Sequence, residues 1–142
     1  MPVAIKRIYE TPSRTDGVRV LVDRLWPRGL SKERAAVDEW LRELAPSDEL
    51  RRLAHAQPEH WPTFRKKYLR ELARPESQDA LRRLYELAHH KKRLTLLFAS
   101  KNQLQNNATV LKELLDGTRK PPTGTGPGAV SAMRKRAAVR RR

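Results

Sequence analysis

Two short apolar runs constrain the fold of this chain more than any other feature of its sequence. VRVLV at 18–22 and LTLLFA at 94–99 are almost wholly β-branched or aliphatic, which is typical of strands that are buried on both faces. A third run, at 3–9, begins by alternating apolar and other side chains, as an opening strand does. The sequence therefore predicts three strands, and the two strongest runs are expected to be central.

The residues between these runs repeat apolar side chains at the spacing of helix faces. Ser47 can accept an otherwise unpaired N–H as an N-cap, so a short helix should follow it. Longer helices are expected from about 58 to 73, from 76 to 90 and from 104 to 115. The apolar faces of these three helices consist of Trp61, Phe64, Tyr68 and Leu72, of Leu81, Leu84, Tyr85 and Ala88, and of Leu104, Ala108, Leu111 and Leu115.

Residues 31–45 fit two interpretations. Ala36, Val37, Trp40, Leu41 and Leu44 form a helical stripe, but a sheet of two or three strands is thin for a chain of this length, and an extended segment over 36–41 would add another strand. We expect a short helical turn followed by an extended piece.

Strands that are separated by helices favour an α/β layer fold containing a parallel pair over a helical bundle. The chain has 142 residues, a usual length for one domain. We predict a single compact α/β domain over 1–116, with a small, mostly parallel sheet flanked by helices. Residues 117–142 are predicted to form a disordered basic tail.

The predicted tail carries more than half of the formal net charge of +15. It holds eight Lys and Arg, no acidic residue and four of the six glycines, so it lacks the apolar surface that would offset the entropy of ordering. Such a segment can contact nucleic acid weakly and without sequence preference, or it can be a solubilising extension with no fixed partner. The candidate nucleic-acid contacts are Arg134, Lys135, Arg136, Arg140, Arg141 and Arg142.

The residue inventory excludes several classes of chemistry. The chain has no cysteine, which removes disulfides, thiol nucleophiles and thiolate metal sites. Its four histidines do not have a metal-binding spacing on one helix face, so neither a metal nor a cofactor is expected. No apolar run approaches the ~20 residues of a membrane span, and no apolar signal segment follows Met1. We expect a cytoplasmic protein with no membrane partner.

Polar side chains follow both of the predicted central strands. Asp23 and Arg24 come directly after the first, with Arg28 four residues further on, and Lys101 and Asn102 follow the second. If the two strands are parallel neighbours, these groups converge at the carboxyl edge of the sheet, where open α/β sheets bind their ligands. The cations would hold a phosphate or a carboxylate, and the start of the last helix would add N–H donors.

The roles at this edge follow from the side-chain chemistry. If the site is catalytic, Asp23 is its acid or base, and Arg24 and Arg28 stabilise developing negative charge. Structural roles are the alternative, with ion pairs for Asp23 and Arg24 and sheet capping for Trp26. Gly29 is expected to supply a positive φ to a turn. The candidate ligand-binding residues are Trp26, Lys101, Asn102, Asn106 and Asn107.

These residues fall in blocks that resemble the YeaO-like family, domain of unknown function 488. The blocks are VRVLVDRLWPRGLSKE at 18–33, DEWLRELAPSDELR at 38–51 and LTLLFASKNQLQNNATVLKELL at 94–115, with W-x-x-F-x-x-x-Y-x-x-E-L at 61–72 between them. The resemblance covers roughly residues 3–116 and stops before the tail. The family's most distinctive positions are matched here by Asp23, Arg24, Trp26, Pro27, Arg28, Gly29, Trp40, Pro46, Ser47 and Asn106.

The resemblance implies a small cytoplasmic protein of bacteria or archaea with a compact α/β fold, and it brings no established activity. Relatives often have an Asn-His pair where this chain has Asn106 and Asn107. This departure removes the imidazole that could transfer a proton or bind a metal at position 107.

Three functions are compatible with the sequence, which leaves open whether the chain is an enzyme. The first is a pocket for a phosphorylated or carboxylated small molecule or nucleotide at the carboxyl edge of the sheet. The second is a nucleic-acid-associated protein that acts through the basic tail. The third is a non-enzymatic protein-interaction module.

Overall fold

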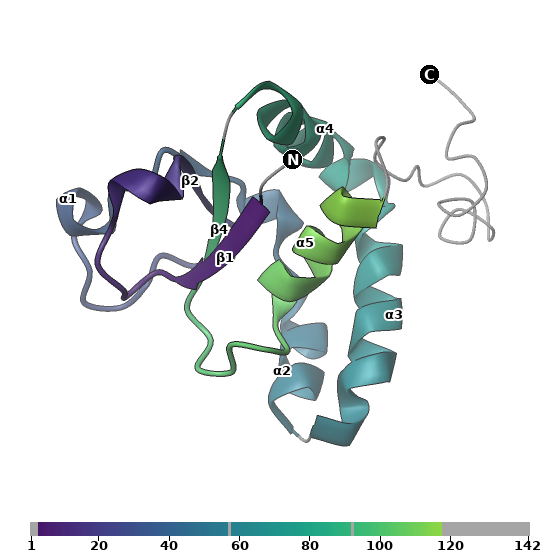
Figure 1. The fold of residues 1–142 in the computed structure, drawn as a ribbon. Coiled ribbons are helices and arrows are strands. Elements are labelled where there is room, and N and C mark those ends of the chain that lie inside the picture. The colour runs from purple at the N-terminus through teal and green to yellow at the C-terminus, as the bar shows by residue number, and fades with distance from the viewer. Residues whose placement is uncertain (1–2, 57, 92, 118–142) are drawn as a thin grey trace.

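The strands lie side by side in one parallel sheet (Figure 1). The computed structural model describes residues 3–56, 58–91 and 93–117, which form one small α/β domain. Within this part of the chain the strands are β1 (Val3–Arg7), β2 (Val18–Leu21), β3 (Glu39–Trp40) and β4 (Leu94–Phe98). The helices are α1 (Lys32–Ala35), α2 (Asp48–Ala56), α3 (Trp61–Leu72), α4 (Pro75–His90) and α5 (Asn107–Gly117), and short 3-10 helices span Arg14–Asp16, Arg42–Leu44 and Pro58–His60.

The strand order β1-β4-β2-β3 places β4 between the two strands that open the chain. Leu94 is the partner of Val3 on one side and of Val18 on the other, so both neighbours start at the same level. The predicted parallel pair of central strands, β2 and β4, is therefore confirmed. Because the strands run the same way, their carboxyl ends meet at one edge of the sheet.

The expected order of a helical turn and an extended piece over residues 31–45 is confirmed. The turn is α1, and the extended piece is β3, which covers two residues of 36–41 and pairs with β2 at the sheet edge. Ala36 between them has a φ of 49°, in the left-handed region that few residues other than glycine adopt.

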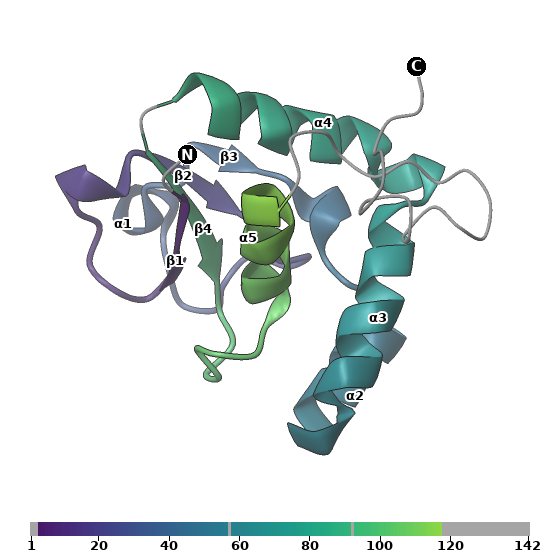
Figure 2. The ribbon, with the colours of Figure 1, turned by 45° about the vertical axis from the view of Figure 1, so that its right-hand side comes forward.

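The two faces of the sheet are covered unequally (Figure 2). Helices α2 to α5 pack on one face and form the larger core, whereas α1 and the chain around it cover the other face. The larger core includes Val20, Leu96 and Phe98 from the sheet with Phe64, Tyr68 and Leu111 from the helices. The smaller core is Ile8, Leu21, Ala35 and Leu97, with Trp26 and Trp40 packed against it.

One helix begins later than its apolar spacing predicts. Leu104 was expected on the buried face of the last helix, but α5 starts at Asn107 and Leu104 is 81% exposed in the preceding loop. The side chain of Asn106 accepts the N–H of Thr109 at 2.9 Å and so defines the helix start. The amide oxygen of Asn102 binds the N–H groups of Leu104 and Gln105, which holds these residues in a turn.

The predicted tail lies outside the described residues, apart from Gly117 at the end of α5. In the described part of the chain, no helix has both the length and the apolarity needed to cross a membrane.

A buried ion pair organises the opposite, amino-terminal half of the sheet. The guanidinium of Arg19 in β2 donates to Asp16 at 2.5 Å and to the carbonyls of Ala35 and Ala36 at 2.7 and 3.0 Å. Its side chain is 5% exposed. Lys6 of β1 donates to the other oxygen of Asp16 at 3.1 Å. One guanidinium thus joins the turn before β2 to the end of α1.

These contacts set the protonation of Asp16. Burial raises the pKa of this carboxyl, but hydrogen bonds from the N–H of Ser13, the ammonium of Lys6 and the guanidinium of Arg19 outweigh burial and leave the pKa below its ordinary value of 3.8. A carboxyl whose pKa is lower in the folded state contributes stability above its unfolded pKa. That contribution is lost as the pH falls through the folded pKa.

Asp16→Asn should lower the free energy of unfolding by roughly 3 kcal/mol at neutral pH, because it leaves the buried guanidinium of Arg19 without its carboxylate. Urea titrations from neutral pH to below the pKa of Asp16 measure this loss. The difference between the two proteins should narrow in acid, since the unmodified carboxyl then loses its charge as well.

The matched control is Asp79→Asn, which breaks an ion pair with Arg82. The side chain of Asp79 is 92% exposed. That change should cost less than about 1 kcal/mol. Equal losses at the two positions would contradict the role given to Asp16.

Candidate functional site

The carboxyl ends of β2 and β4 are joined directly to each other. One carboxylate oxygen of Asp23 accepts the N–H of Ala99 at 2.8 Å. The side-chain amide of Asn107, at the start of α5, donates to the carbonyl of Val22 at 3.0 Å and to the second oxygen of Asp23 at 3.1 Å. The residues that follow the two strands are therefore joined through Asp23 and Asn107, whereas the described contacts join none of the predicted cations, Arg24, Arg28 and Lys101, to another.

Asp23 serves as a structural acceptor in this arrangement. Its carboxylate joins β2 to β4 and to α5, and its main-chain carbonyl accepts the indole N–H of Trp40 at 2.7 Å. The charge of Asp23 also acts on Tyr68, whose pKa is raised well above its ordinary value, chiefly by complete burial and further by Asp23 and Glu71. The hydroxyl of Tyr68 donates to the carbonyl of Leu44.

The predicted amide ligands also stabilise the edge itself. Asn106, 3% exposed, caps α5 and donates to the carbonyl of Asn102 at 2.8 Å. Asn102 binds two N–H groups of the loop through its side chain, and its own N–H donates to the hydroxyl of Ser100 at 3.2 Å. Asn107 is 8% exposed and bound to β2. The loop between β4 and α5 is therefore folded by its own side chains.

The predicted cations are the groups at this edge that these structural hydrogen bonds leave available to bind a ligand. Arg24, Arg28 and Lys101 are exposed, and among the described residues none of them has a carboxylate partner within 4 Å. Arg24 makes one long hydrogen bond, 3.4 Å, to the carbonyl of Pro46 before α2. Arg24 thus faces the β3 side of the edge.

Sequence reasoning missed two residues of this edge, Arg7 and Tyr9. The guanidinium of Arg7 donates to the carbonyls of Ala99 and Ser100 at 3.0 Å and lies 5.0 Å from the centre of the Tyr9 ring. The hydroxyl of Tyr9 donates to the carbonyl of Arg28 at 3.1 Å. The first strand is predicted over 3–9, which includes both residues, whereas β1 ends at Arg7; a rule that reads only the residues after a strand therefore passes over them.

Trp26 packs into the smaller core. Its ring meets that of Trp40 edge-on at 5.5 Å, and its indole N–H donates to the carbonyl of Leu30 at 2.6 Å. This geometry is that of the sheet-capping role considered as an alternative to ligand binding. Gly29 has a φ of 75°, which confirms the expected turn.

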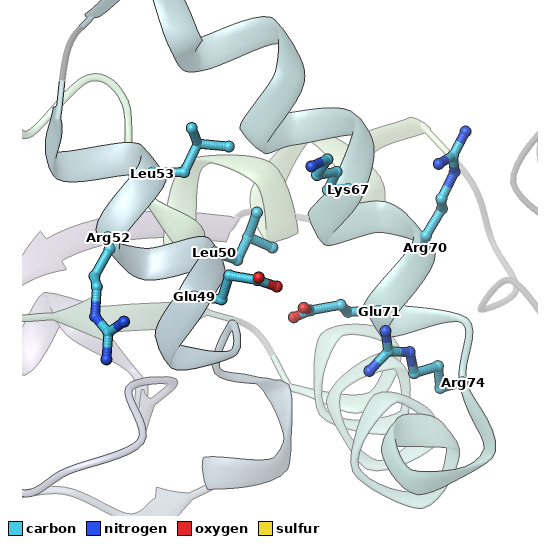
Figure 3. A pocket seen from close by; sticks show the side chains of 8 residues that line it. All are labelled: Glu49, Leu50, Arg52, Leu53, Lys67, Arg70, Glu71 and Arg74. Carbon is cyan, nitrogen blue, oxygen red and sulfur yellow. The ribbon is translucent and has the colours of Figure 1, made fainter.

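A separate cavity of about 570 Å³ lies between α2 and α3 (Figure 3). Glu49 and Glu71 point toward each other across it, whereas Arg52 and Arg70 point away. Both carboxylate oxygens of Glu71 already accept hydrogen bonds from Ser47, at 2.9 and 2.6 Å. None of the predicted site residues lines this cavity, which is lined by Glu49, Leu50, Arg52, Leu53, Lys67, Arg70, Glu71 and Arg74.

The chemistry available at the carboxyl edge is thus the binding of negative charge. Arg7, Arg24, Arg28 and Lys101 offer donors, while the carboxylate and amides among them hold the loops together. In the described residues no group of three or more His, Asp or Glu side chains is placed to hold a metal ion. The six tail residues predicted to contact nucleic acid, from Arg134 to Arg142, lie outside the described residues.

A small parallel sheet, covered mainly on one face and carrying cations at its carboxyl edge, defines the class of this protein as a compact α/β domain. The chain belongs to the DUF488-N3i family, described as the inactive DUF488-N3 subclade, whose model matches residues 2–126. The resemblance to domain of unknown function 488 is thereby confirmed.

Two relatives illustrate the similarity. The uncharacterized protein YeaO of Escherichia coli (strain K12) is 46% identical over 115 residues, which cover 81% of this chain and 97% of that protein. The uncharacterized protein Rv3073c of Mycobacterium tuberculosis (strain H37Rv) is 37% identical over 115 residues, 81% of this chain and 94% of the relative. No solved structure matches the chain.

Asn107→Asp should destabilise the fold far more at neutral pH than in mild acid, because it places a second carboxylate against that of Asp23. Two neighbouring carboxylates titrate as a pair, so protonation of one relieves the repulsion. At neutral pH the free energy of unfolding should fall by about 2–4 kcal/mol, because the carbonyl of Val22 loses its donor and two negative charges are brought together. Thermal or urea unfolding across this pH range measures it.

Asn106→Asp is the control at the adjacent residue, which is also buried. Aspartate caps helices about as well as asparagine, so this change loses mainly the bond to Asn102 and should cost less. A pH-independent loss at position 107 would show that Asp23 is not the partner that matters.

Proposed function

We propose that this protein is a non-catalytic binding module that recognises an anionic group, phosphate or carboxylate, at the carboxyl edge of its sheet. The observation that carries the proposal is a difference in what the polar residues of this edge contact. Asp23, Asn102, Asn106 and Asn107 are used in hydrogen bonds that build the edge. The cations beside them, Arg24, Arg28 and Lys101, have no acidic partner among the described residues.

Two further observations support binding over catalysis. Asp23, the acid–base candidate, has both carboxylate oxygens bound to Ala99 and Asn107. A general base needs an oxygen within reach of the proton that it removes. The family to which the chain belongs is itself described as an inactive subclade.

The proposal predicts saturable binding of inorganic phosphate or citrate to the full chain. In heteronuclear NMR titrations, the amide signals that move should be those of 7–10, 24–29 and 99–102. Replacing Arg28 and Lys101 together by glutamine should weaken binding about tenfold, because two charge-assisted contacts are lost.

The matched control replaces Arg14 and Lys66 by glutamine, which removes the same charge from exposed positions elsewhere. Binding should then change little. Shifts that do not saturate, or that both double variants reduce equally, would reject a localised site.

A second candidate function is weak nucleic-acid binding through the basic tail. It is supported by the sequence, in which the last nine residues hold Arg134, Lys135, Arg136, Arg140, Arg141 and Arg142 and the whole of 117–142 contains no acid. Contacts of this kind release counterions and depend steeply on salt.

If all six residues contact phosphates of a DNA duplex, the logarithm of the binding constant should fall with the logarithm of salt concentration with a slope of roughly −5. Fluorescence anisotropy of a labelled duplex measures the slope, and changing the six residues to glutamine should remove most of it. Binding that ignores salt, or that survives this change, would exclude the tail as the contact.

A further inference from the structure

We infer that the carboxyl edge docks an acidic protein segment that also carries apolar side chains; this inference rests on the proposed function and specifies its partner. Among the described residues, the large apolar side chains that are exposed are Tyr9 at 43%, Leu25 at 70% and Leu104 at 81%. Each follows a different strand, β1, β2 or β4, and all three therefore lie on the loops of the carboxyl edge. A scattered exposed leucine needs no explanation, but a set confined to one edge marks an interaction surface.

The exposed position of Leu104 is fixed by hydrogen bonds within the loop between β4 and α5. The N–H of Leu104 donates to the side chain of Asn102 at 3.0 Å, and the next N–H, of Gln105, does the same at 2.9 Å. Asn106 then ties the loop back to Asn102 and starts α5. Figures 1 and 2 show this loop extending past the ends of β1 and β4. The leucine is therefore held in water by a turn with defined hydrogen bonds.

The three loops form one surface because they are bonded to each other. Arg7, the last residue of β1, binds the carbonyls of Ala99 and Ser100 after β4. Tyr9 binds the carbonyl of Arg28 in the loop after β2. Asn107 then links the far end of the β4 loop to β2. A surface held in this way loses little conformational entropy when a partner binds.

The positive charge of the carboxyl edge favours a negatively charged partner. Arg7 ends β1, and Arg24, Arg28 and Lys101 lie on these loops, where the acids are Glu10 and the structurally engaged Asp23. Glu10 is itself used, because its carboxylate accepts the main-chain N–H of Arg7 at 3.0 Å. Complementary potentials across an interface speed association and select the partner. A second copy of this chain, with its net charge of +15, is a poor match.

The apolar groups favour a protein over a nucleic acid. Bases are held by stacking on aromatic rings, but Leu25 and Leu104 are aliphatic, and the ring of Tyr9 already lies beside the guanidinium of Arg7. The same Glu10 contact also occupies the outward N–H at the end of β1, so a partner strand cannot continue the sheet there. The edge is suited to side-chain contacts from an acidic segment with tyrosine, leucine or phenylalanine.

Two polymers test this inference on the full chain: polyglutamate, and a glutamate–tyrosine copolymer of the same length. Both present negative charge, but the copolymer alone offers apolar surface. Isothermal titration should show the copolymer binding about tenfold more tightly, as expected from burying part of the exposed leucines. Changing Leu25 and Leu104 together to serine should bring the two affinities to within about twofold while leaving that of polyglutamate unchanged. Arg28→Gln should weaken both.

The outcomes separate this inference from the function on which it rests. If phosphate binds at the edge but the serine variant keeps the copolymer preference, the docking inference is overturned and the anion site stands. If neither phosphate nor either polymer binds at the edge, both fail. Tighter binding of single-stranded DNA than of the copolymer, lost in the same leucine variant, would also overturn it in favour of nucleic acid.

Discussion

The face of the sheet that α1 covers depends on the contacts of one guanidinium, that of Arg19. It is almost completely buried, and its donors reach Asp16 and the carbonyls of Ala35 and Ala36. Within the described residues, this face of the sheet is covered by α1 and the chain on either side of it, and by no long helix. A buried charge is costly unless its partners are all in place, so this one fixes the path of the segment that covers the sheet. The same segment then carries Trp26, Arg28 and Gly29 to the carboxyl edge.

The two ends of the sheet use charge in opposite ways. At the amino end, the buried carboxylate of Asp16 pairs with both Arg19 and Lys6. At the carboxyl end, Asp23 satisfies main-chain and amide donors, and the guanidinium and ammonium groups around it stay in water. The first arrangement stabilises the fold, and the second leaves charge that a partner can meet. The two ends differ in how their acids are used, because Asp23 accepts hydrogen bonds from a backbone N–H and an amide. Counting the charges does not show this difference.

The sequence predicted the layered α/β fold because its strongest signals are local. The runs at 18–22 and 94–99 are typical of buried strands, and the stripe from Trp61 to Leu72 is a helix face. Leu104 shows where this reasoning stops: its spacing suits α5, but Asn102 and Asn106 bind the backbone before the helix can reach it. At the edge, the chain positions of Asp23, Arg24, Arg28 and Lys101 followed from the strand ends. That Asp23, Asn106 and Asn107 would be engaged with the backbone required the three-dimensional contacts of distant residues.

The position of β4 has a consequence for the order in which the protein can form. β1 and β2 do not pair with each other, and each pairs with β4, which the ribosome makes some 70 residues later. At roughly 5–20 residues per second, β1 waits for seconds without β4, and β2 waits for it with only the two-residue strand β3 on its other side. The side of each strand that pairs with β4 stays open during that interval, and α2 to α4 must wait for the same sheet. The domain is therefore expected to fold late in synthesis, when the central strand emerges between two strands that are already present.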